Sequence, residues 1–151
     1  MANITKKKAC GCACGAAKEA LLTPADAIMA VAILAVSSDG KLDKSEIYDL
    51  ENVLIMNPLF KEVEDAGGYL SCIASAIANK GRGTVLKKAA SLLSQSLRET
   101  AYAWAVHVAA SDRKVVGAEH KFLSELRKEL KIHGVLAGKI NAVVPMLYRT
   151  K

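Results

Sequence analysis

The sequence predicts an all-α protein, a single helical bundle of about seven to nine helices with an internal pseudo-twofold repeat. Apolar residues make up 52% of the chain but aromatic residues only 5%, so we expect Ala, Leu, Ile and Val to form the core. Three prolines are present, and no alternating β-branched pattern indicates a sheet. The remaining observation is a motif that occurs twice.

The motif begins at Ser38-Asp39-Gly40-Lys41 and is followed by Glu46; it returns as Ser111-Asp112-Arg113-Lys114, followed by Glu119. The offset is 73 residues, from position 39 to position 112, and it also places Asp26 on Glu99. The two repeats cover about residues 24–57 and 97–130. A duplicated unit of this size is typical of two supersecondary units that pack against each other.

Helix starts are predicted by three capping boxes, in which the first residue and the residue three positions later bond to each other's backbone. The first is Thr23 with Asp26, with Pro24 at the first helical position, and the second is Asp43 with Glu46. The third is Ser96 with Glu99. Further helices are expected at about residues 69–78, 84–93, 119–130 and 135–144, with a loop at residues 79–83.

Residues 1–18 are predicted to be a flexible tail rich in Cys and Lys, ahead of a helical domain at 19–151. The tail holds Cys10, Cys12 and Cys14, a spacing typical of thiolate clusters for soft metals. The alternative is a disordered tail without metal. Cys72 stands alone in a helical pattern and is expected in the core.

Six carboxylates form the candidate metal set: Asp26, Asp39, Glu46, Glu99, Asp112 and Glu119. Carboxylates suit hard cations such as calcium, magnesium or manganese. If the two apolar helices pack antiparallel, Asp26 would join Asp112 and Glu119, and Glu99 would join Asp39 and Glu46. The competing interpretation is that Asp26, Glu46 and Glu99 only cap helices, where acids also complement the helix dipole.

Catalytic motifs are not found in the sequence. It contains no glycine-rich phosphate loop and no Glu-x-x-His pair, so we expect no enzyme. His107 and Trp104 are expected to be core residues. The net charge is +6, but no Lys/Arg stripe with interleaved aromatics indicates nucleic-acid binding. The longest apolar run, residues 27–36, is too short to cross a bilayer and no signal peptide is recognisable, so we expect a cytoplasmic protein.

The segment Ala35-Val36-Ser37-Ser38-Asp39-Gly40-Lys41-Leu42 with Glu46, repeated over residues 109–119, resembles the TerB family of tellurite-resistance proteins. A similar domain occurs in membrane-anchored DnaJ-type cochaperones. The resemblance covers about residues 20–133. It implies a helical fold of two related halves and a non-enzymatic scaffold that binds a divalent cation. It also implies protein partners in a stress-response complex at the inner face of the membrane.

Two positions depart from the pattern of the first copy. Arg113 stands where the first copy has glycine, and Val116 stands where it has Asp43, so the second site is the less acidic.

Overall fold

Helices are the regular elements of the part of the chain that the computed structural model describes: residues 21, 23–37, 42–111 and 117–150, without the side chains of 117–120. Seven α-helices and two short 3₁₀ helices lie in these ranges, which confirms the all-α prediction. They are α1 (Pro24–Val36), α2 (Lys44–Met56), η1 (Pro58–Phe60), α3 (Ala66–Lys80), α4 (Arg82–Leu92), α5 (Gln95–Ser111), α6 (Gly117–Glu129), α7 (Gly134–Val143) and η2 (Val144–Tyr148).

Helix α1 is the centre of the structure. Every residue from Asp26 to Ala35 is buried, and the helix contacts α2, α3, α4, α5 and α6. A helix that is apolar on all sides can be stable only where other helices surround it. Its alanines, among them Ala27, Ala30 and Ala32, add little bulk between the neighbouring backbones.

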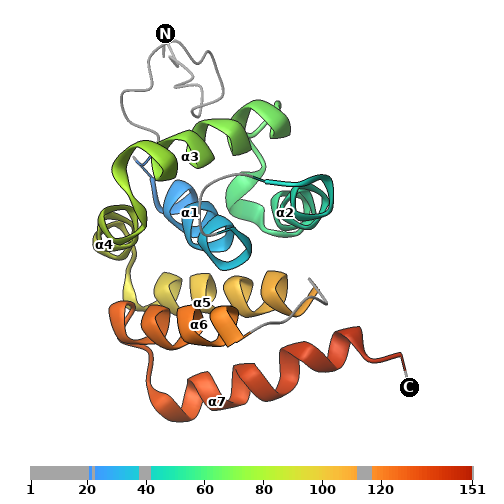
Figure 1. The fold of residues 1–151 in the computed structure, drawn as a ribbon, viewed down its shortest axis with the longest axis vertical. Helices are drawn as coiled ribbons and strands as arrows, with labels where there is room; N and C mark the ends of the chain where they lie inside the picture. The colour runs from blue at the N-terminus through green and yellow to red at the C-terminus, as the bar shows by residue number, and fades with distance from the viewer. Residues whose placement is uncertain (1–20, 22, 38–41, 112–116, 151) are drawn as a thin grey trace, which may run out of the picture.

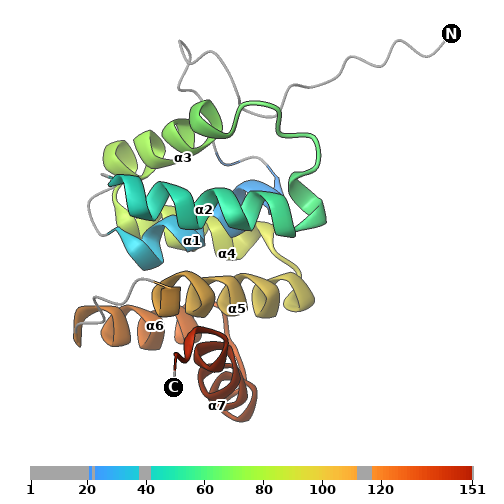
Figure 2. The ribbon, with the colours of Figure 1, turned by 90° about the vertical axis from the view of Figure 1, so that its right-hand side faces the viewer.

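The helices form successive layers (Figures 1 and 2). Helix α3 covers one end of the molecule, followed by α1 with α2 and α4, and then by α5 with α6. Helix α7 lies at the opposite end from α3. In the described part of the chain, no helix has the length and apolar character needed to cross a membrane.

The first helices of the two predicted repeats are α1 and α5. They contact each other and run in the same general direction in both views. This differs from the antiparallel packing on which the predicted cross-repeat carboxylate groups depended. Helix α1 contacts α2 and α6, and α5 contacts the same two helices. The pseudo-twofold relation of the repeats stays a prediction.

The boundaries of α3 and α4 differ from the sequence prediction. Helix α3 starts at Ala66, earlier than expected, because the Oδ1 atom of Asp65 accepts a hydrogen bond from Gly68 N at 3.0 Å. The predicted loop at 79–83 shrinks to a single non-helical residue, Gly81, between α3 and α4. Gly81 has φ of 85° and ψ of 153°, a conformation that is essentially restricted to glycine.

Candidate functional site

Asp26 is buried, with 5% of its surface exposed, whereas Glu46 and Glu99, the other candidate carboxylates whose side chains the structure describes, are half-buried. Its Oδ2 atom accepts a hydrogen bond from Thr23 N at 3.1 Å, and Thr23 Oγ1 accepts one from Asp26 N at 3.2 Å. The Tyr69 hydroxyl, on α3, donates to Oδ1 of Asp26 at 2.8 Å. A buried carboxylate requires such donors. The capping box is therefore confirmed, and the same side chain joins the start of α1 to the start of α3.

Glu46 belongs to the second predicted capping box, which the structure also confirms. Its Oε2 atom accepts from Asp43 N at 2.9 Å, while Asp43 Oδ1 accepts from Glu46 N at 2.8 Å. Both bonds lie near the surface. This carboxylate stabilises the first turn of α2.

The third predicted capping box is wrong. Helix α5 begins at Gln95, and the side chain at its start is Ser94, whose Oγ accepts from Leu97 N at 3.3 Å. Ser96 lies inside the first turn, and Glu99 lies beyond the capping positions, half-buried on the helix. Asp26 and Glu99 therefore have different roles, although the repeat offset superimposes them.

The structure does not bring the predicted metal ligands together in the residues that it describes. Asp39, Asp112 and the cysteines Cys10, Cys12 and Cys14 lie outside the described residues, as does the side chain of Glu119. Within the described ranges, no group of three or more His, Cys, Asp or Glu side chains could hold a metal ion. Because α1 and α5 run in the same direction, the start of α1 and the end of α5 lie at opposite ends of the pair. The grouping of Asp26 with the residues after α5 is thus not favoured.

His107 and Trp104 are half-buried on α5 and form an aromatic cluster with Tyr148 of η2. The Trp104 and His107 rings meet edge to face at 5.3 Å, and the His107 and Tyr148 ring centres are 5.4 Å apart. The Tyr148 hydroxyl lies 3.0 Å from Nε2 of His107 and 3.2 Å from Nδ1. The cluster fastens η2 to the C-terminal half of α5.

Burial determines the protonation of this cluster. It lowers the pKa of His107 below 6.5, against an opposing effect of Asp49 on α2. It raises the pKa of Tyr148 above 10.0, an effect that Asp49 adds to and a hydrogen bond with Ser111 reduces. Both groups are therefore neutral at pH 7. Ser111 Oγ donates to the carbonyl of Val108 at 2.9 Å, an arrangement that stabilises the last turn of α5.

The outward side of α2 carries an apolar surface that the sequence reasoning missed. We call this the α2 surface: Tyr48, Ile55, Met56 and Leu59, the last from η1. Ile55 is 81% exposed and Met56 is 62% exposed, whereas Leu50, Val53 and Leu54 of the same helix are buried. The only signal in the sequence was a helix with apolar residues on more than one side. Helix α2 also carries the acidic residues Asp49 and Glu51, and Glu62 and Glu64 follow η1 in the chain.

The chain matches no known family model, no curated protein and no solved structure.

Proposed function

We propose that this protein is a non-enzymatic interaction module of a stress response and that the α2 surface is its docking site for a protein partner. The observation that carries the proposal is the exposure of Ile55 and Met56 on a well-formed helix. Clustered exposed apolar side chains on a folded protein mark an interaction site. The TerB-like motif supports a cytoplasmic stress response to tellurite, at the inner face of the membrane.

The composition of the α2 surface defines the partner that would fit it. Its apolar residues require an apolar surface on the partner. The carboxylates of Asp49, Glu51 and Glu62 favour basic residues around that surface. An amphipathic helix with Lys or Arg at its margins meets both requirements.

A divalent cation is the second part of the proposal. The oxygen ligands of the motif residues suit calcium, magnesium or manganese. Since Asp26 and Glu46 already accept hydrogen bonds in capping boxes, the proposal depends most on Asp39, Asp112 and Glu119. In this proposal the cation binds the repeated motif residues that follow α1 and α5 in the chain.

The test is tellurite survival of the native host in which variants replace the chromosomal copy. We expect Ile55→Asp with Met56→Asp to abolish protection while the purified protein keeps its helical circular dichroism and melting temperature. The matched control is Ser75→Asp with Ala78→Asp, two exposed residues on α3 that belong to no proposed contact site. Full protection by the α2 variant would refute the docking proposal.

The same assay decides the alternative function, in which the tail thiolates bind or reduce the toxic species. Under that alternative, replacing Cys10, Cys12 and Cys14 by serine abolishes protection and the α2 variant retains it. Under the docking proposal the pattern is reversed.

A further inference from the structure

Charge is unevenly distributed along this chain. Residues 1–65 contain seven Lys and Arg against ten Asp and Glu, a net charge of −3, whereas residues 66–151 contain fourteen against five, a net charge of +9. The last acidic residue is Glu129, so residues 130–151 carry basic residues and no acid. The C-terminal layer of the molecule, α7 with η2, therefore belongs to the basic half of the sequence.

Helix α7 and η2 present two different sides. Leu136, Ala137, Ile140, Val144 and Tyr148 are buried or half-buried against the body. The other side is an exposed stripe at intervals of three or four residues: Val135, Lys139, Val143, Met146 and Leu147. Val143 is 59% exposed and Leu147 is 73% exposed. We call this stripe the α7 surface.

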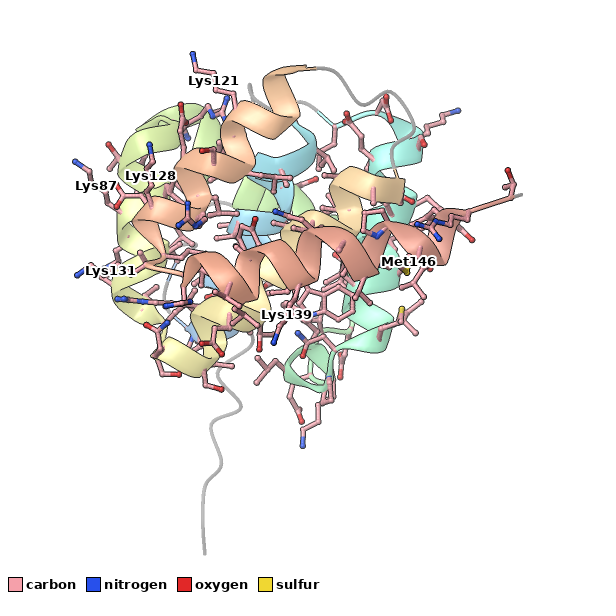
Figure 3. The ribbon with its side chains drawn as sticks, turned by 90° about the horizontal axis from the view of Figure 1, so that it is seen from below. Lys87, Lys121, Lys128, Lys131, Lys139 and Met146 are labelled. Carbon is pink, nitrogen blue, oxygen red and sulfur yellow. The ribbon has the colours of Figure 1, made fainter. Side chains whose placement is uncertain are left out.

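Lysines gather toward one end of the α7 surface, at the start of α7, and Met146 lies toward the other end (Figure 3). Lys139 lies within it, and Lys128 and Lys131 lie beside the start of α7, with Lys87 of α4 and Lys121 of α6 further along the same side. All five are exposed. Helix α6 carries three acidic residues, Glu119, Glu125 and Glu129, and α7 carries none, so the five lysines are in excess.

We propose that the α7 surface is a contact site for membranes that contain anionic phospholipids. An exposed helix at the edge of a molecule, with apolar residues on its outward side, a lysine among them and further lysines beside its start, has the composition of an interfacial helix. Anionic headgroups complement the lysines, and the acyl region takes up Val143, Met146 and Leu147. A nucleic acid would leave these three apolar side chains without a partner.

The inference goes beyond the docking proposal because it uses a different surface in a different layer. Each basic residue near an anionic membrane contributes about 1 kcal/mol, which corresponds to about a fivefold change in partition. Loss of Lys128 and Lys139 should therefore weaken binding by at least about 25-fold. Replacement of buried apolar contacts by carboxylates should weaken it further.

The experiment is co-sedimentation of the full chain with vesicles of phosphatidylglycerol and phosphatidylcholine, and with vesicles of phosphatidylcholine alone. We expect binding to the anionic vesicles only, weakened by added salt. Both Lys128→Glu with Lys139→Glu and Val143→Asp with Leu147→Asp should abolish it. The matched controls on the α2 side, Lys44→Glu with Lys61→Glu and Ile55→Asp with Met56→Asp, should bind as the wild type does.

Three results would overturn the inference. The first is the absence of binding to anionic vesicles, as expected if an acidic amphipathic protein covers the α7 surface instead. The second is a loss of vesicle binding in the α2 controls as large as that in the α7 variants, which would indicate that binding responds only to the net charge of the protein. The third is binding that survives both α7 variants, which would assign it to Lys6, Lys7 and Lys8 of the tail, since every variant keeps them.

Discussion

Tyr69→Phe tests whether the hydrogen bond to the buried carboxylate of Asp26 holds the start of α1 against α3. The substitution removes one oxygen and leaves the ring and its edge contact with Phe60 in place. The Tyr69 hydroxyl donates at 2.8 Å to a carboxylate that is 5% exposed. Hydrogen bonds to charged groups contribute about 1.5–3 kcal/mol, so we expect the free energy of unfolding to fall by about 2 kcal/mol.

For a chain of this length, about 2 kcal/mol corresponds to a decrease in melting temperature of roughly 4–8 °C. The assay is urea and thermal unfolding followed by circular dichroism. Tyr48→Phe is the matched control, because that side chain is exposed. Tyr102→Phe, which removes a bond to the neutral amide of Asn141 at 3.1 Å, should lie between the two. A Tyr69→Phe protein as stable as Tyr48→Phe would refute the reasoning.

Three further measurements address other parts of the structure. Burial lowers the pKa of His107 below 6.5 in the folded protein. As the pH falls below 6.5, His107 therefore binds a proton in the unfolded chain before it does so in the folded chain, and the folded state loses stability. His107→Gln should remove this part of the pH dependence of the melting temperature. Gly81→Ala should destabilise by about 1–3 kcal/mol because of its positive φ, while Gly83→Ala, in helical backbone with open space around it, should stabilise by up to about 1 kcal/mol in the same unfolding assay. Calcium should raise the melting temperature of the wild type but not of Asp39→Asn; no rise in the wild type would mean that the acidic residues act only as caps.

Local features of the helices could be predicted from the sequence because their partners are close in the chain. The bonds of Asp26 with Thr23 and of Glu46 with Asp43 span three residues, so composition and spacing were sufficient. The start of α5 was predicted two residues late, because Ser94 and Ser96 are both good caps and the sequence does not distinguish them. The choice depends on where the previous helix ends and the chain turns.

The all-α class, the two capping boxes and the apolar helix at the start of the domain were thus determined by the sequence alone, since each depends on short-range bonds or on the pattern of apolar residues. Only the tertiary structure put that helix at the centre of the bundle. Only the tertiary structure decided which distant side chains meet. Tyr69 reaches Asp26 across 43 residues, and Tyr148 reaches His107 across 41. It also decided that α1 and α5 run in the same direction and that Ile55 and Leu147 stay exposed. These features depend on how whole helices pack, and apolar side chains favour burial without specifying their partner.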